Sequence, residues 1–335
     1  MYCNSCLMQI PKDEITFCTE CGVPLHKKCA NKCLECGVEL CDSCFSENHF
    51  RCSECYNPEK PFSHIRRSYI KQYEMCPHSL FLQLVEGVDP PMSKYAQLGI
   101  LVHAIIEDLQ AGNINVNQAV QRLDAEVEEW NMNTEDEYSI IPLGLLDVGF
   151  KCIQNFMDIL PLLSGESVIE EKIQYSLDES LPDITCTLDR ISFVDDKIHI
   201  HDWKTGKPMS GKKLVEDLQP PLYLLAVKSK YGKMPDSFTL HYLANTKNLT
   251  YRKVDDDTYT VKTARSEYTL KISEAVERTK KILEGISKSE YPIPSEKEVS
   301  WYCNSMCWYG LSGYCKSAQT EQWRKINRER ENANS

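Results

Sequence analysis

The run ITCTLDRISFVDDKIHIHDWKTG, residues 184–206, decides the fold. Its alternating, β-branched composition predicts strands over residues 184–194 and 197–203, joined by a hairpin turn at Asp195 and Asp196. Side chains along a strand alternate between the two faces of a sheet, so residues 198, 200 and 202 share one face. His199 and His201 point to the other face, and we expect both to lie outside a site built around residue 202.

Two carboxylates and an ammonium stand near the ends of these strands: Asp189, Asp202 and Lys204. Carboxylates hold hard divalent cations, which lower the pKa of a bound water, and a nearby lysine orients or deprotonates that water. This chemistry suits hydrolysis of a phosphodiester bond. An exposed hairpin with acidic tips is the alternative, because the pattern Asp-x-Lys is short and recurs by chance.

Two predicted helices add polar residues to this set. The segment GILVHAIIE, residues 99–107, has helical apolar spacing, and Gly99, His103 and Glu107 share one stripe because they recur every four residues. The segment QPPLYLLAV, residues 219–227, opens a second helix, with Gln219 and Tyr223 one turn apart. A histidine or a tyrosine on such a helix is more often structural than functional when it is considered alone. The prediction of a site therefore rests on the combination of these residues.

In this order the motifs resemble the RecB-type branch of the PD-(D/E)XK nuclease superfamily, over roughly residues 65 to 318. The resemblance implies an α/β fold of the restriction-endonuclease type, with a mixed sheet flanked by helices, and a metal-dependent deoxyribonuclease. Relatives often carry Glu where this chain has Asp202, and either carboxylate binds metal. The implied roles are Mg²⁺ or Mn²⁺ ligands for His103, Asp189 and Asp202, catalysis for Lys204, and substrate positioning for Gln219 and Tyr223.

Four further cysteines resemble the iron-sulfur nucleases of this branch, including the AddB subunit and the CRISPR-adaptation exonucleases. Cys76 precedes the core, and Cys303, Cys307 and Cys315 follow it. The resemblance implies a [4Fe-4S] cluster that ties the two ends of the domain together. Zn²⁺ on the same four thiolates and reduced, unligated thiols remain alternatives, because the late spacing C-x3-C-x7-C departs from the usual pattern.

Residues 1–60 predict a separate zinc-binding module, because they hold most of the cysteines in pairs with two residues between the partners. Six pairs make about three four-ligand Zn²⁺ sites. The pairs are Cys3 and Cys6, Cys18 and Cys21, His26 and Cys29, Cys33 and Cys36, Cys41 and Cys44, and Cys52 and Cys55.

The pairing within the zinc module stays open between an interleaved scheme, similar to RING or PHD cross-braces, and a serial one. An internal repeat relates residues 18–29 to residues 33–44, with His26 replaced by Cys41. His49 is a spare candidate ligand that we expect to be exposed. Too few large apolar residues are present to form a core, so metal must stabilise this module.

The 335 residues therefore divide into the zinc module, 1–60, and a nuclease domain, 61–335. The net charge of −11 lowers nonspecific affinity for nucleic acid, although Lys207, Lys212 and Lys213 follow the active-site strand as a candidate phosphate rim. Residues 1–60 carry more acidic than basic side chains, which favours protein docking, for example to a helicase, a recombinase or another repair or replication factor.

Paired thiols without a leader peptide or a membrane-length apolar run predict a reducing cytoplasm, and the compact fusion suits a phage or mobile element. No phosphate-loop motif of an ATP motor occurs in the sequence. We expect a DNA exonuclease recruited or loaded through its zinc module. The alternatives are a structure-specific flap or branch endonuclease, and a zinc-finger adaptor or ubiquitin-ligase-like protein that uses the nuclease fold as a scaffold.

Periodicity predicts the remaining elements more coarsely. We expect strands over 168–177 and 238–243 and a charged surface helix over 266–287. Glu170 or Glu171, on the first of these strands, has the position to approach the metal, but alternation favours an exposed or lysine-paired role for at least one, so neither joins the site. Amphipathic helices are also expected over residues 117–130 and 143–160.

Overall fold

The computed structural model describes residues 15–27, 30–32, 38–41, 62, 64–134, 136–293, 303 and 307–315. The chain forms two compact units. One comprises residues 1–89, 176–184 and 280–335, and the other comprises residues 90–175 and 185–279. The predicted boundary near residue 60 falls outside the described residues and stays a prediction.

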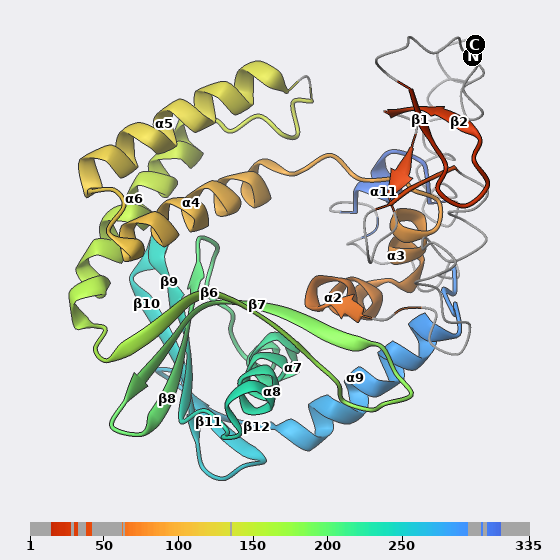
Figure 1. The fold of residues 1–335 in the computed structure, drawn as a ribbon. Helices are drawn as coiled ribbons and strands as arrows, with labels where there is room; N and C mark the ends of the chain where they lie inside the picture. Colours follow the sequence, from red (N-terminus) through yellow and green to blue (C-terminus); the bar gives the residue numbers. More distant parts are fainter. Residues whose placement is uncertain are drawn as a thin grey trace, which may run out of the picture. The chain divides into compact units, whose positions relative to one another are not determined.

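A mixed eight-stranded sheet is the main feature of the fold, as the sequence predicts (Figure 1). The strand order is β12-β11-β10-β9-β8-β7-β5, and β6 also pairs with β7. The strands β8 and β9 run parallel, whereas the other registered pairs are antiparallel. The strands are β5 (His64–Arg66), β6 (Glu166–Tyr175), β7 (Asp183–Val194), β8 (Lys197–Lys204), β9 (Ser237–Tyr242), β10 (Lys247–Lys253), β11 (Thr258–Lys262) and β12 (Glu267–Lys271).

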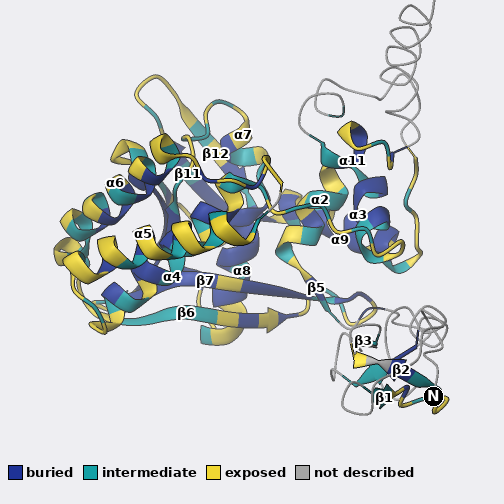
Figure 2. Ribbon diagram, turned by 90° about the horizontal axis from the view of Figure 1, so that it is seen from above, coloured by how far each residue is buried: buried dark blue, intermediate teal, exposed yellow. Residues whose placement is uncertain are grey.

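The β7–β8 hairpin fixes the register that the site needs. Asp195 and Asp196 both adopt left-handed backbone angles, with φ of 47° and 60°. A two-residue turn with positive φ at both positions matches the twist of the flanking strands, and Asp tolerates this conformation better than most residues. Arg190 pairs with His201 across the hairpin, so the next positions along the ladder bring Asp189 beside Asp202. Figure 2 shows β7 largely buried between its neighbours.

Three helices form an apolar layer at one end of the strands (Figure 1). They are α4 (Lys94–Ala111), α5 (Val116–Asn133) and α6 (Leu143–Ile159). Ser93 caps the start of α4, because its hydroxyl accepts from the Ala96 N–H at 3.2 Å. Such caps satisfy an otherwise unpaired helical donor. Leu98, Val102 and Phe156 are buried in this layer against Trp203 of β8, which anchors α4 to that strand.

The helices α7 (Lys213–Glu216) and α8 (Gln219–Tyr231) belong to the same unit. Pro220 and Pro221 occupy the first turn of α8, where a missing N–H costs no intrahelical bond. The helix packs on β6, and Tyr175 donates from its hydroxyl to the Leu222 carbonyl at 3.0 Å. Its first residue, Gln219, is buried, so α8 presents that amide to the interior of its unit.

The other unit contains α2 (Arg67–Met75), α3 (Pro77–Leu84), the end of α9 (Ile272–Ser287) and α11 (Trp308–Leu311). Tyr309 of α11 donates from its hydroxyl to the Val88 carbonyl at 2.9 Å. That bond ties the late cysteine region to the segment after α3. Four short strands stand in the N-terminal region: β1 (Ile15–Phe17), β2 (Pro24–His26), β3 (Asn31–Lys32) and β4 (Glu39–Leu40).

The predicted helix over 266–287 is wrong at its start, because Glu267–Lys271 forms the edge strand β12 and the helix begins at Ile272. Pairing of Tyr259 with Leu270, both buried, overrides the local helical pattern. The expected helices over 117–130 and 143–160 and the strands over 168–177 and 238–243 are confirmed within a few residues. No helix among the described residues is long and apolar enough to cross a bilayer.

Gly149 of α6 generates a stability prediction. A Cβ at this position would meet Leu123 Cδ2 at 2.8 Å and Leu98 Cδ1 at 2.9 Å, and both leucines are buried. Overpacking of this kind costs about 1–3 kcal/mol, which outweighs the gain of about 1 kcal/mol from replacing a helical glycine. We expect Gly149→Ala to lower the free energy of unfolding in a urea titration.

Gly144, in the first turn of the same helix, is the matched control, because a Cβ added to it would meet nothing within 4 Å. Gly144→Ala should leave the free energy of unfolding unchanged or raise it. Equal behaviour of the two variants would contradict the packing seen around Gly149.

Candidate active site

Asp189 lies at the centre of the polar cluster on β7. Its side chain is buried, and Oδ2 accepts from the backbone N–H of Trp203 at 2.6 Å. Oδ1 lies 3.5 Å from Nδ1 of His103 on α4. A buried carboxylate held by one backbone donor keeps a fixed orientation, with the other oxygen facing the imidazole. The structure thus brings together the first two predicted metal ligands.

Asp202, 2% exposed on β8, is the most buried acidic group of the site. Its Oδ1 accepts from Nε2 of Gln219 at 2.6 Å, and its Oδ2 lies 2.6 Å from Nζ of Lys204. The helix α8 therefore supplies the amide that orients this carboxylate. The contact gives Gln219 a definite place beside Asp202.

Tyr223 lies one turn further along α8, where its side chain is only 6% exposed. It packs edge-on against Phe238, with the two ring centroids 5.9 Å apart. This packing fixes α8 on the sheet. The predicted substrate-positioning role of Tyr223 stays a prediction.

Glu170 joins the site, although the sequence pattern did not place it there. Within the described residues, ligand atoms of His103, Glu170 and Asp189 all lie within 4.8 Å of one another. Glu170 has a φ of 50°, which is uncommon for a non-glycine residue in a strand. Its neighbour Glu171 forms an ion pair with Lys230. The sequence does contain a feature that points to Glu170: two adjacent glutamates on a strand. Because side chains alternate along a strand, one of the two must face the site.

The charges of the site are arranged around the buried acids. Burial alone would lower the pKa of His103, but Asp189 and Asp202 raise it to about 9. Burial alone would raise the pKa of Asp189, but His103 and Lys204 lower it below its ordinary value. Burial raises the pKa of Asp202, and Lys204 opposes that rise. Burial and the charge of Asp189 raise the pKa of Glu170 to about 7.

This set of donors fits a hard divalent cation. Two carboxylates and one imidazole converge, those of Glu170, Asp189 and His103, and such ligands suit Mg²⁺ and Mn²⁺. Lys204 adds a single positive charge at one side. Burial is the main cause of the raised carboxyl pKa values of Glu170 and Asp202, and repulsion from Asp189 adds to both; a bound cation would oppose these shifts.

The histidines of β8 lie away from this cluster, as the alternation predicts. His201 Nδ1 lies 3.0 Å from His241 Nε2, and His199 Nδ1 lies 2.8 Å from Ser237 Oγ. Burial lowers the pKa of His201 to about 3, so the ring is neutral at physiological pH. The rings of His201 and His241 pack beside Trp203, on the face of the sheet opposite Asp202.

The four cysteines of the predicted clasp are close enough to influence one another. Cys315 is buried with Leu82 and Tyr309, and Cys303 and Cys307 pack against this cluster. Burial raises the pKa of the Cys76 thiol, and the charges of Cys315 and Cys303 add to the rise. The pKa of Cys307 is raised by burial and by Cys76 and Cys303. Cys152 and Cys186 are buried core residues, as predicted.

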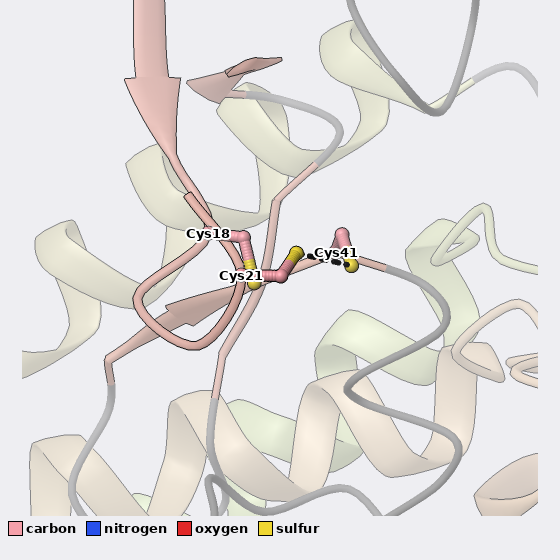
Figure 3. Close-up of side chains that lie close together, drawn as sticks. All are labelled: Cys18, Cys21 and Cys41. Carbon is pink, nitrogen blue, oxygen red and sulfur yellow. Dashed lines mark hydrogen bonds between the residues drawn. The ribbon is translucent and has the colours of Figure 1, made fainter. Parts of the chain in front are cut away.

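A second cysteine group lies in the N-terminal region, where Cys18, Cys21 and Cys41 converge (Figure 3). Their sulfur atoms all lie within 4.8 Å of one another, and those of Cys21 and Cys41 are 3.7 Å apart. The Thr19 N–H donates to the Glu39 carbonyl at 2.8 Å, which holds the two segments together. This group joins the second pair to the fifth, so it does not fit a strictly serial pairing.

Most other predicted zinc ligands lie outside the described residues. These are Cys3, Cys6, Cys29, Cys33, Cys36, Cys44, Cys52 and Cys55. The backbone of His26 belongs to β2, where it pairs with Ile15. Three thiols at mutual contact distance fit a tetrahedral Zn²⁺ site.

A family profile described as the PD-(D/E)XK nuclease superfamily matches residues 67–315, well over half of the chain. No curated protein matches the chain. Among solved structures, one titled "Crystal structure of SSO0001" is 14% identical, over 64% of this chain and 93% of that chain, with a TM-score of 0.28. A likeness at that score adds nothing to the family match.

The family match and the metal-ligand cluster together suggest metal-dependent nuclease activity. Two carboxylates on paired strands, a lysine at the end of one of them and an imidazole from a neighbouring helix provide the chemistry for that activity. The chain belongs to the PD-(D/E)XK nuclease superfamily.

Glu170 generates a prediction about metal binding. Removing its charge should weaken Mn²⁺ binding about tenfold or more, because one of the converging ligands is lost. Mn²⁺ binding near neutral pH should also release protons, since the cation displaces them from Glu170, with its pKa of about 7, and from His103, with its pKa of about 9. Affinity should therefore rise with pH up to about 9. Calorimetry in buffers of different ionisation enthalpy measures both the affinity and the protons released.

Glu171→Gln is the matched control, because this neighbouring side chain pairs with Lys230 instead. Glu170→Gln should reduce both the affinity and the proton release, whereas Glu171→Gln should change neither. Equal affinities for the wild type and Glu170→Gln would remove Glu170 from the site.

Proposed function

We propose that this protein is a DNA nuclease of the RecB-like type that hydrolyses phosphodiester bonds with Mg²⁺ or Mn²⁺, most simply as an exonuclease. The observation that supports this proposal best is the convergence of His103, Glu170 and Asp189, with the ion pair of Asp202 and Lys204 on the neighbouring strand. The RecB type and the exonuclease mode rest on the motif resemblance. The acidic pair and the lysine are intact, which disfavours an adaptor that uses the fold only as a scaffold.

The residues of the site divide the chemistry between them. His103, Asp189, Asp202 and Glu170 would hold the cation, which supplies charge neutralisation at the phosphate and an acidified water. The Trp203 N–H and the Gln219 amide hold Asp189 and Asp202 in place, so that little reorganisation is needed. The ammonium of Lys204 lies 2.6 Å from Asp202, where it would donate a hydrogen bond that orients the attacking water.

We propose a [4Fe-4S] cluster on Cys76, Cys303, Cys307 and Cys315. Besides burial, the charges of Cys315 and Cys303 raise the pKa of the Cys76 thiol, and those of Cys76 and Cys303 raise the pKa of Cys307, which supports one shared site. The choice of an iron-sulfur cluster rests on the motif resemblance, and a single Zn²⁺ remains the alternative.

We propose that residues 1–60 bind about three Zn²⁺ ions and dock a protein partner, such as a helicase, a recombinase or another repair or replication factor. Cys18, Cys21 and Cys41 support one zinc site. Cys44 is the expected fourth ligand, because it completes the C-x2-C pair that begins at Cys41. The pairing favours an interleaved or nested arrangement of sites.

Cleavage assays test the proposed activity. Asp202→Ala and Lys204→Ala should each lower the rate of DNA cleavage about 10² to 10⁴-fold, because each removes a group that touches the cation or the attacking water. Glu171→Gln should cleave like the wild type. The assay compares linear, closed circular and branched DNA under saturating Mg²⁺ or Mn²⁺.

The substrates separate the alternatives. Cutting of linear DNA alone supports the exonuclease, cutting of closed circles rejects a purely exonucleolytic role, and preference for branches supports the structure-specific endonuclease. Undiminished cleavage by Asp202→Ala and Lys204→Ala would refute the site assignment.

Elemental analysis of anaerobically purified protein tests the two cysteine sites. We expect about four iron and three zinc per chain, the numbers that one [4Fe-4S] cluster and three zinc sites require. Cys76→Ser should lose iron and keep zinc, whereas Cys18→Ser should lose about one zinc and keep iron. An iron-free wild type with a fourth zinc would replace the cluster with a zinc clasp.

A further inference from the structure

The lysine loop, residues 205–213, directly follows the proposed catalytic Lys204 and carries only positive charge. Its lysines are Lys207, Lys212 and Lys213. All three are exposed, and none forms an ion pair with a residue that the structure describes. No acidic side chain belongs to the loop, although the chain as a whole has a net charge of −11. The loop is therefore a local region of attraction for anions.

Hydrogen bonds fix the course of the lysine loop along the sheet. Tyr242 of β9 lies opposite Lys204 in the register, and its hydroxyl accepts from the Met209 N–H at 3.2 Å. Just after the loop, Tyr251 of β10 donates from its hydroxyl to the Leu214 carbonyl at 2.6 Å. The helix α7 then packs on β12. The loop therefore leads from the end of β8 across β9 and β10 toward β12.

The lysine loop begins within reach of the active site. Burial raises the pKa of Tyr242, the charge of Lys204 opposes that rise and the charge of Asp202 adds to it. The hydroxyl that holds Met209 therefore lies within electrostatic range of both active-site residues. Lys207 is three residues beyond Lys204, so their Cα atoms are at most about 11 Å apart. The lysines thus form a series that starts beside the reacting groups and leads away from them.

A nucleic-acid strand is the anion that fits a series of ammonium groups leading away from a hydrolytic site. Its phosphates recur at regular intervals with one negative charge each, so a strand cut beside Lys204 passes further phosphates along the loop. A small anion would occupy only part of that series. Lysine binds phosphate as a point charge, and such contacts hold the backbone without reading the bases. The loop therefore suits substrate holding without sequence preference.

We propose that the lysine loop binds the phosphate backbone of the DNA strand that the active site cuts. The inference rests on the proposed nuclease function and adds how the protein holds its substrate beyond the scissile bond. Lys207 meets the phosphates nearest the metal, whereas Lys212 and Lys213 meet phosphates further along the strand. The hydrogen bond from Met209 to Tyr242 keeps the loop in place for these contacts.

Fluorescence anisotropy over a range of salt concentrations tests the loop. The full-length chain binds a labelled thymidine oligonucleotide, with Lys204→Ala present in every protein so that the strand is not cut. The loop variant combines Lys207→Gln, Lys212→Gln and Lys213→Gln, and should bind about tenfold or more weakly at low salt. The slope of log affinity against log salt concentration should become shallower by about 2, because each lost phosphate contact on a single strand removes about 0.7. A merely structural effect would leave that slope unchanged.

The matched control replaces by glutamine three exposed lysines of the same unit that lie outside the loop: Lys172 on β6, Lys197 at the start of β8 and Lys228 in the last turn of α8. It changes the net charge by the same amount and should keep the slope of the parent. An unchanged slope in the loop variant, or an equal change in both variants, would overturn the inference. Failure of the proposed function appears separately, as a wild-type chain that cleaves no DNA.

Discussion

The structure depends on the burial of two carboxylates side by side, one in the middle of β7 and one near the end of β8. Burying like charges is costly unless each is compensated. Asp189 is compensated by a backbone N–H and an imidazole, and Asp202 by an amide and an ammonium. Three elements supply the side chains among these partners: α4 supplies His103, α8 supplies Gln219 and β8 supplies Lys204. The repulsion between the two buried carboxylates is therefore reduced by these partners, and a bound divalent cation would reduce it further.

Compensation is incomplete without that cation. The carboxyl groups of Asp202 and Glu170 both have raised pKa values, chiefly because they are buried and also because Asp189 repels their charges. Mutual repulsion of these groups costs folding free energy in the metal-free protein, while the same repulsion favours cation binding. Glu170 also has a positive φ, which is a strained backbone conformation for this residue type. Strained residues are common at functional sites, where the surrounding structure holds them in place.

The motifs predicted the core of the site because they show both the strand alternation of the side chains and the residue types that bind a metal. The alternation around Asp202 placed His199 and His201 on the opposite face, and the Asp195–Asp196 turn set the hairpin register. Glu170 was missed because a strand with adjacent glutamates does not show which one faces the site; the bulge-like φ at Glu170 is a property of the folded sheet. The edge strand β12 was missed because its pairing with β11 is a contact that the local pattern does not record.

The cysteines show the same division between local and non-local information. Spacing predicted the ligand pairs, but the union of Cys18 and Cys21 with Cys41 comes from contacts between β1 and β4. Likewise Cys76 and Cys315 are distant in sequence, yet the charge of Cys315 adds to the rise that burial causes in the pKa of Cys76, and Cys315 packs with Leu82 and Tyr309. Metal sites of this kind stabilise segments that cannot bury enough apolar surface alone.

Anomalous diffraction from crystals soaked in Mn²⁺ tests the central claim most directly. We predict one strong manganese peak within bonding distance of the His103 imidazole and of the carboxylates of Asp189 and Asp202. A peak elsewhere, or none at saturating Mn²⁺ with these side chains in the positions described, would contradict the account.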